Sequence, residues 1–365
     1  MAEDHGNGGF SMAERIELID KNFLVNTDID REQVTFYDVL QKPFRLYGVH
    51  MENDWFRRMP EKVAKSVSEG IFGSHTFTAG GRLRFVTDCD YIAISAEMGR
   101  VCHFSHMPIA GTGGFDVYAR EGKRDIYAGS LIPPVNMTEG YQGLKQLFPD
   151  RRKRLITIHF PLYAMVKRLY IGLDENAVIE RAPDYEIEKP VVCYGSSITH
   201  GACASRPGNC YENILTRRLD CDFFNLGFSG NAKGETTMAE YIAGLPMSAF
   251  VMDYDHNAPT VEHLQATHER MFRIIRKAQP DLPILIMNRP KYNRTSEEDK
   301  RYEIIRATYE RAAESGDRLV WFLDGKSLMA DILEDGTVDD CHPNDAGFYS
   351  MARAIEPVLR EMLNL

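Results

Sequence analysis

The pattern of apolar residues changes near residue 190, and this change constrains the fold more than any other feature of the 365-residue chain. Before it, short stretches of alternating apolar and polar residues predict strands. After it, apolar runs alternate with segments of helical periodicity, which implies parallel strands joined by right-handed crossovers. Glu188-Lys189-Pro190 makes a plausible boundary. The sequence thus predicts an N-terminal segment (1–35), a β domain (36–185) and an α/β domain (190–365).

The β domain is expected to be a sandwich, most simply of jelly-roll type, because it combines many short strands with Gly-containing turns. The alternation of residues 82–87 and 92–96 around Asp88-Cys89-Asp90 predicts a hairpin. Residues 113–128 predict a second hairpin, and 155–160 and 167–173 two further strands. Met12–Leu24 is compatible with a short helix or an edge strand.

The α/β domain is expected to have three layers, α/β/α. Its predicted strands are 191–194, 222–225, 248–253, 283–287 and 319–323. Helical periodicity places apolar residues on one face in 261–275, 302–312 and 348–362.

Charge and composition exclude several classes of partner. The chain has 43 Lys and Arg against 53 Asp and Glu, a net charge of −10, with no basic stripe, which argues against nucleic acid and anionic membranes as partners.

The acidic start of the chain does not resemble a secretory signal, and no apolar run reaches membrane-spanning length. Seven scattered cysteines without a C-x-x-C pair indicate reduced thiols. We therefore expect a cytoplasmic protein, and the sequence leaves its oligomeric state open.

Four polar loops follow strands of the predicted parallel sheet. They are 195–197, 225–231, 253–257 and, after the last strand, 339–345. Because the carboxyl ends of parallel strands meet at one edge, we expect these loops to converge. Acyl transfer needs a nucleophile, a base, a group that orients the base, and donors for the oxyanion. A serine, a histidine, an aspartate three residues before it, a glycine amide and an asparagine amide meet these requirements.

These four loops resemble those of the SGNH (GDSL-type) hydrolases, whose fold is a flavodoxin-like α/β/α sandwich. The resemblance covers 190–365 and is carried by the ordered Ser, Gly and Asn together with the Asp-x-x-His-Pro-Asn motif. It implies Ser197 as nucleophile, His342 as general base and acid, and Asp339 as the partner that orients His342. It also implies an oxyanion hole, and the implied donors are the amides of Ser197 and Gly230 and the side chain of Asn257. No cofactor or metal is implied.

The N-terminal region, with Gly114-Phe115-Asp116-Val117-Tyr118, resembles the β-sandwich that precedes this domain in certain two-domain SGNH esterases. Several of those enzymes remove acetyl groups from carbohydrates.

The chain departs from the family pattern at two places. The usual Gly-Asp-Ser is Gly195-Ser196-Ser197, so the choice of Ser197 between two adjacent serines rests on the family register. Glycines that usually precede the oxyanion asparagine are replaced by Asp255 and His256, which are candidates for narrowing the pocket or contacting substrate. Arg289 is a third candidate for lining the site, and a structural role for it is equally compatible.

Other readings of these residues are weaker. An α/β-hydrolase would need Gly-x-Ser-x-Gly, but Thr199 stands two residues after Ser197. His200, Cys203, Cys341 and His342 match no common zinc spacing. His103 and His106 alternate on a predicted strand, which favours a packed or solvated face over a pair of metal ligands.

The sequence therefore predicts a serine esterase that hydrolyses O-acetyl esters of plant-type oligosaccharides or polysaccharides. A lipase-like or thioesterase-like acyl hydrolase is the alternative, although the loops are rich in Asp, His, Asn and Arg. An inactive glycan-binding protein is less compatible with a complete triad. We also expect the sandwich to pack against the hydrolase domain and wall one side of an open groove, because the linker 186–190 is short and lacks Gly and Ser.

Overall fold

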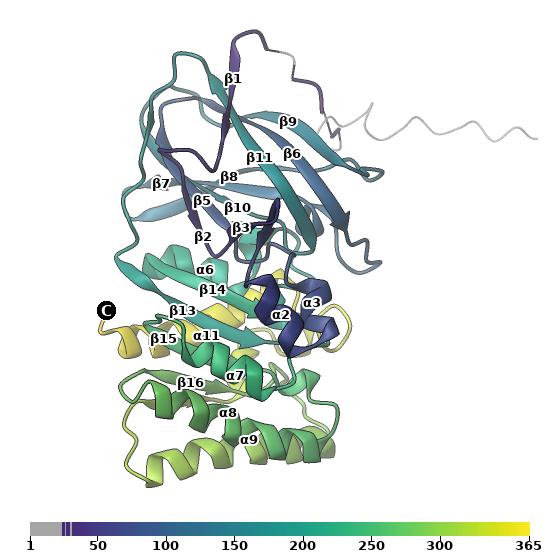
Figure 1. The fold of residues 1–365 in the computed structure, drawn as a ribbon, viewed down its shortest axis with the longest axis vertical. Coiled ribbons are helices and arrows are strands. Elements are labelled where there is room, and N and C mark those ends of the chain that lie inside the picture. Colours follow the sequence, from purple (N-terminus) through teal and green to yellow (C-terminus); the bar gives the residue numbers. More distant parts are fainter. Residues whose placement is uncertain (1–23, 26, 30) are drawn as a thin grey trace, which may run out of the picture.

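The computed structural model describes residues 24–25, 27–29 and 31–365. A β-sandwich is stacked on a three-layer α/β/α domain, and the two are in direct contact (Figure 1). Of the segment for which a helix or an edge strand was considered, residues 12–23 lie outside the described residues.

The sandwich consists of two antiparallel sheets around one apolar core. The first has the order β1-β11-β6-β9, comprising Val34–Asp38, Ala164–Asp174, Tyr91–Val101 and Gly140–Gln146. The second has the order β12-β5-β10-β7-β8, comprising Ile179–Glu180, Arg82–Thr87, Arg154–His159, Phe115–Glu121 and Arg124–Leu131, and β2 (Arg45–Tyr47) also pairs with β5. A separate ribbon is formed by β3 (His50–Glu52) and β4 (Trp55–Arg57), and α4 (Ile109–Thr112) precedes β7.

One of the two predicted hairpins is present and the other is not. Strands β7 and β8 pair across a turn in which Gly122 has a φ of 59°. By contrast β5 pairs with β10, β12 and β2, whereas β6 pairs with β11 and β9. The turn at Asp88–Asp90 therefore carries the chain from one sheet to the other, so the prediction of a hairpin there was wrong. Alternation reports which face of a strand is apolar and does not identify its partner.

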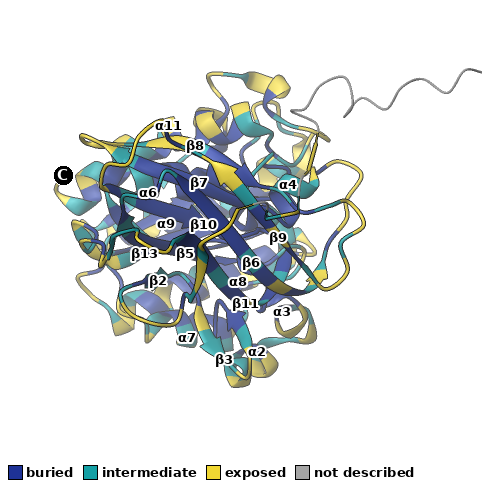
Figure 2. Ribbon diagram, turned by 90° about the horizontal axis from the view of Figure 1, so that it is seen from above, coloured by how far each residue is buried: buried dark blue, intermediate teal, exposed yellow. Residues whose placement is uncertain are grey.

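The strands β5, β10 and β7 of the second sheet are largely buried on both faces, and Figure 2 shows them in dark blue. The apolar side chains of Leu83 and Phe85 point into the sandwich core. The alternate residue Arg82 faces the α/β domain, where it forms an ion pair with Asp222 and donates to the carbonyl of Phe223 at 2.8 Å. The polar face of β5 is therefore an interface between the two domains.

The α/β domain contains a five-stranded parallel sheet in the order β14-β13-β15-β16-β17. These strands are Cys221–Gly227, Ile187–Gly195, Ala249–Asp253, Ile284–Met287 and Val320–Leu323. In chain order this is 2-1-3-4-5, the flavodoxin-like order, as expected. The order reverses between β13 and β15, and ligands of such sheets bind at the carboxyl ends of the strands at this switch point.

Helices cover both faces of this sheet. One face packs against α6 (Tyr211–Leu219) and α11 (Asp345–Leu363), and the other packs against α7 (Thr236–Ala243), α8 (Val261–Ala278) and α9 (Ser296–Glu314). Shorter helices are α5 (Ser197–His200), η2 (Pro207–Asn209), η3 (Asp255–Asn257), α10 (Gly325–Leu328) and η4 (Leu333–Gly336). Val191 and Cys193 of β13 belong to one core, whereas Val192 and Tyr194 belong to the other. This two-sided burial explains why the strand reads as an unbroken apolar run.

Two of the three helices inside the range of the predicted β domain contribute to the core of the α/β domain, which was not expected. Helices α2 (Glu61–Val67) and α3 (Glu69–Ser74) lie beside the α/β domain (Figure 1), and their residues Ala64 and Ile71 are part of its apolar core. Glu188–Pro190, the expected boundary, lies within β13. No helix among the described residues combines the length and apolar character needed to cross a membrane.

Candidate active site

The loop after β13 exposes Ser197 and buries Ser196. Ser196 caps α5, since its Oγ accepts a hydrogen bond from the amide of Ile198 at 3.2 Å, and it is 1% exposed. Ser197 is the first residue of α5 and is partly exposed, so its own amide has no partner inside the helix. The turn requires glycine before the serines, because a Cβ on Gly195 would lie 2.0 Å from Thr199 Oγ1.

Ser197, His342 and Asp339 are joined by hydrogen bonds. Ser197 Oγ donates to His342 Nε2 at 2.8 Å, and His342 Nδ1 donates to Asp339 Oδ2 at 2.8 Å. The backbone amide of His342 also donates to Asp339 Oδ1 at 2.7 Å. A carboxylate can only accept, so Asp339 holds the proton of His342 on Nδ1 and leaves Nε2 as the acceptor that faces Ser197.

The polar residues of the Asp-x-x-His-Pro-Asn motif each make a hydrogen bond that shapes the loop. The amide of Val338 donates to the carbonyl of His342 at 2.9 Å, which closes the loop around the carboxylate of Asp339. Asn344 Oδ1 accepts from the amide of Gly347 at 3.0 Å and caps α11. Partial burial would raise the pKa of Asp339, but hydrogen bonds from the backbone and ring of His342 lower it below its usual value.

Gly230 and Asn257 lie on one small cavity of about 460 Å³, which is also lined by His256 and Arg289. Gly230 has a φ of 71° and has open space where a Cβ would stand. Asn257 Oδ1 accepts from the amide of Ala232 at 3.3 Å, so Nδ2 is left as a donor. This arrangement supplies polar hydrogens of the kind that stabilise an oxyanion.

Of the three candidate substrate-contacting residues, His256 and Arg289 line this cavity and Asp255 does not. Asp255 is 1% exposed and lies outside the lining of the cavity, where its Oδ2 accepts from Arg289 Nε at 3.3 Å. Arg289 also donates to Glu298 at 2.9 Å, and so it combines a structural role with a place in the lining. Burial lowers the pKa of His256 well below its ordinary value, so this ring is neutral, and its Nδ1 lies 3.6 Å from Cys341 Sγ.

The cavity is lined by residues of the α/β domain, but the sandwich holds one of the site loops in place through residues that sequence patterns did not indicate. Tyr163 stacks on His200 with ring centroids 4.1 Å apart, and its hydroxyl lies 2.6 Å from Ser229 Oγ. Ser229 also lies 3.3 Å from His200 Nδ1, while His200 Nε2 lies 2.8 Å from the carbonyl of Leu162. His200 Nε2 must donate to that carbonyl, so its Nδ1 accepts from Ser229, and Ser229 in turn accepts from Tyr163. The residue before Gly230 is thus held by the sandwich.

Arg58, in the segment between β4 and α2, also holds the end of β14 and the loop after it. Its guanidinium donates to the carbonyl of Gly227 at 2.5 Å and to Asn225 Oδ1 at 3.2 Å, and it stands over the ring of Phe228. Burial lowers the pKa of Arg58 to about 9. No local pattern marks Tyr163 or Arg58, because their role arises from contacts between domains.

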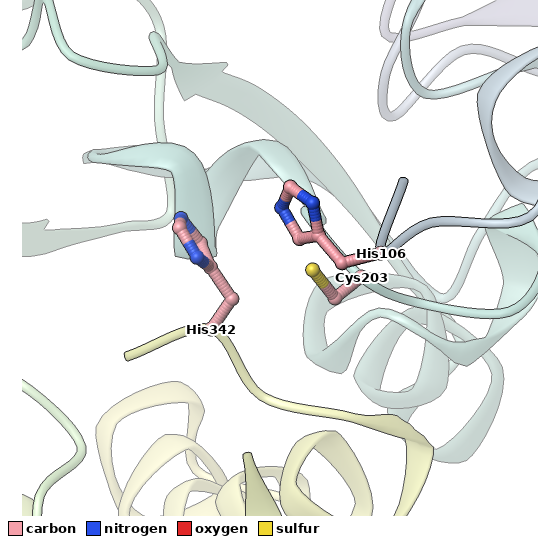
Figure 3. A group of neighbouring side chains, drawn as sticks. All are labelled: His106, Cys203 and His342. Carbon is pink, nitrogen blue, oxygen red and sulfur yellow. The ribbon is translucent and has the colours of Figure 1, made fainter. Parts of the chain in front are cut away.

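One group of described residues could hold a metal ion, and it differs from the set considered in the sequence. The ligating atoms of His106, Cys203 and His342 all lie within 4.8 Å of one another (Figure 3). His200 and Cys341 are not part of this group. His103 and His106 lie in the loop after β6 instead of alternating on a strand, so that prediction was wrong.

Comparison with known proteins identifies both domains. Residues 188–360 match the family model of the GDSL-like lipase/acylhydrolase family, and residues 34–179 match the model for the N-terminus of SGNH-hydrolase-type esterases. A search of curated protein sequences found no significant match.

Solved structures with the same architecture span nearly the whole chain. A GDSL-like lipase from Bacteroides ovatus is 26% identical with a TM-score of 0.80, and the alignment covers 91% of this chain and 98% of that one. The salicylyl-acyltransferase SsfX3 of a tetracycline biosynthetic pathway is 18% identical, with a TM-score of 0.74 and the same coverage. A family two carbohydrate esterase from Cellvibrio japonicus is 12% identical, with a TM-score of 0.60 over 91% and 98% of the two chains.

Proposed function

Because this chain belongs to the GDSL-like, SGNH-type ester hydrolases, we propose that it is an acetylesterase that removes O-acetyl groups from a carbohydrate. Ser197 Oγ attacks the acetyl carbonyl and its proton passes to His342 Nε2, which Asp339 orients from the other side. The amides of Ser197 and Gly230 and the Nδ2 group of Asn257 donate to the oxyanion of the tetrahedral intermediate.

The intermediate then collapses with cleavage of the bond between the acyl carbon and the sugar oxygen. His342 gives its proton to that oxygen, so the sugar leaves as an alcohol and the acetyl group remains on Ser197. A water molecule repeats the sequence with His342 as base, and acetate is released. The atoms and protons balance without a cofactor.

The observation that carries this proposal is the unbroken set of hydrogen bonds from Ser197 through His342 to Asp339. The two further oxyanion donors, Gly230 and Asn257, line a polar cavity. Side chains at the cavity such as His256, Asn257 and Arg289 offer donors and acceptors to a hydroxyl-rich substrate. The cavity is too polar to attract a long acyl chain, which favours acetyl over longer esters. The likeness to a family two carbohydrate esterase supports the choice of substrate class.

The test is to measure acetate release from a panel of acetylated oligosaccharides, with an acyl-length series of activated esters alongside. We expect turnover of at least one acetylated glycan and a fall in kcat/KM from acetyl to butyryl and octanoyl esters. Equal or better turnover of octanoyl esters would instead favour a lipase-like hydrolase. A chain that turns over no ester at all would contradict the proposal.

A further inference from the structure

The sandwich brings a second histidine to the catalytic histidine. His106 lies in the loop between β6 and α4, and its ring centroid is 6.0 Å from that of His342. The side chain of His106 is exposed, and no ion pair or hydrogen bond of its ring is found among the described residues. Its ring is tilted against that of Phe104 with centroids 6.0 Å apart, and a rotation of this exposed side chain breaks no hydrogen bond found among the described residues.

Cys203 completes this group from the hydrolase domain. Cys203 is 5% exposed and adopts a left-handed backbone with a φ of 70°, which is uncommon for a residue with a side chain. Such a conformation persists only when its surroundings hold it in place, and here the amide of Cys203 donates to Met107 Sδ at 3.4 Å. Met107 follows His106 directly, so the two loops that carry His106 and Cys203 are held together.

We propose that His106, Cys203 and His342 form a binding site for a zinc ion, and that zinc bound there arrests the esterase. Imidazole nitrogen and thiolate sulfur are the donors that zinc prefers over magnesium or calcium. The donor atoms lie within 4.8 Å of one another, and zinc bonds of roughly 2.0–2.3 Å require them to approach by about 1 Å. A rotation of the exposed side chain of His106 can supply this approach. The fourth position is left to water.

Binding would withdraw His342 from catalysis whichever of its nitrogens is used. Coordination at Nε2 replaces the hydrogen bond from Ser197, and coordination at Nδ1 replaces the hydrogen bond to Asp339. With zinc on Nε2, that lone pair cannot accept the proton of Ser197. With zinc on Nδ1, the single proton of the neutral ring moves to Nε2, which then cannot accept a proton either. The thiol of Cys203 would release its proton to solvent when it binds, as zinc ligands do. Inhibition is therefore expected to be reversible by a chelator.

The inhibition part of this proposal rests on the proposed esterase function, so its test has two arms. The first measures hydrolysis of an activated aryl acetate by tag-free protein in buffered free Zn²⁺, with each variant compared with its own uninhibited rate. We expect inhibition that a chelator reverses and that Mg²⁺ does not reproduce. His106→Ala and Cys203→Ser should each raise the half-inhibitory Zn²⁺ concentration at least tenfold.

Matched controls come from the neighbouring residues of the same types. His103→Ala removes an exposed histidine of the same loop, and Cys341→Ser removes the thiol adjacent to His342. Both should keep the wild-type sensitivity to Zn²⁺. Equal sensitivity of all four variants, or loss of sensitivity only in Cys341→Ser, would overturn the assignment.

The second arm measures binding without catalysis. Co²⁺ added to the full chain should produce a thiolate-to-cobalt charge-transfer absorption that Zn²⁺ displaces. This absorption should be lost in Cys203→Ser and retained in Cys341→Ser. A protein that binds cobalt in this way but hydrolyses no ester would preserve the site and contradict only the proposed function. Absence of the charge-transfer band in the wild type would overturn the site itself.

Discussion

At the scale of single residues, the two adjacent serines have separate tasks. Ser196 is buried and caps α5, whereas Ser197 is partly exposed and forms a hydrogen bond with His342. We expect Ser197→Ala to abolish hydrolysis of an activated acetate with no change in thermal stability. Ser196→Ala should keep the nucleophile but lose about 1 kcal/mol of stability with the cap. Rates and thermal unfolding of both variants test this, and an inactive Ser196→Ala beside an active Ser197→Ala would reverse the assignment.

Asn257 is expected to act on charge that exists only in the transition state. Asn257→Ala should lower kcat by roughly 10²–10³ and leave KM nearly unchanged. Asn257→Asp is the matched variant, because its carboxylate still accepts from the amide of Ala232 but offers no donor to the oxyanion. It should be at least as impaired as the alanine variant. A change confined to KM would place Asn257 in substrate binding.

At the scale of elements, the loop after β14 depends on the sandwich for its position. The hydroxyl of Tyr163 holds Ser229, which precedes Gly230. We expect Tyr163→Phe to lower kcat several-fold with little change in KM, because the stacked ring remains and only the hydrogen bond is lost.

Tyr141→Phe is the control for Tyr163→Phe. It removes a buried hydroxyl that donates to the carbonyl of Leu131 inside the sandwich, at 2.8 Å. Both variants should lose a similar amount of stability, on the order of 1 kcal/mol, but only Tyr163→Phe should lose kcat. Equal kcat in the two variants would mean that Tyr163 serves stability alone.

At the scale of the whole molecule, the two domains share a core. Phe77, Leu162 and Tyr163 of the sandwich are buried against residues of the α/β domain, and Arg82 is buried against Asp222. We expect a fragment of residues 186–365 to be insoluble or to lack cooperative unfolding, because it would expose this apolar surface. Soluble expression followed by thermal unfolding checks this. A fragment that unfolds cooperatively and keeps full activity would contradict the dependence.

Buried Glu212 of α6 should make stability depend on pH. Burial raises its pKa from 4.5 to about 8, and its Oε1 accepts from Asn225 Nδ2 at 3.3 Å. The folded state then holds this proton more tightly than the unfolded state, so stability falls as pH rises between these two values, by about 1.4 kcal/mol per pH unit.

Glu212→Gln keeps the shape and the neutral form of this side chain, so it should remove that part of the pH dependence. Denaturant unfolding of wild type and variant at pH 5.5 and pH 8 measures the difference between them. We expect Glu212→Gln to gain stability relative to wild type as pH rises. A difference that stays constant between the two pH values would show that Glu212 is not the protonated group.

The sequence by itself determined the parallel sheet, its helices and the order of the polar loops, because these follow from local periodicity and chain connectivity. Strand β13 reads as an apolar run since both of its faces are covered, and the loops after such strands must meet at one edge. The choice of Ser197, His342 and Asp339 came from the family register, and the geometry brings these three side chains together.

Only the tertiary structure decided which sheet each sandwich strand joined and which residues make contacts between the two domains. Strands β5 and β6 have similar alternation but lie in different sheets, since alternation does not identify a partner. Arg82 is a charged residue on the alternate face of β5, and a second domain covers it and supplies Asp222 as its counter-ion. Tyr163 and His106 reach the catalytic loops across long sequence separations. Contacts of that kind depend on how two complete domains dock, and no short window of sequence contains that information.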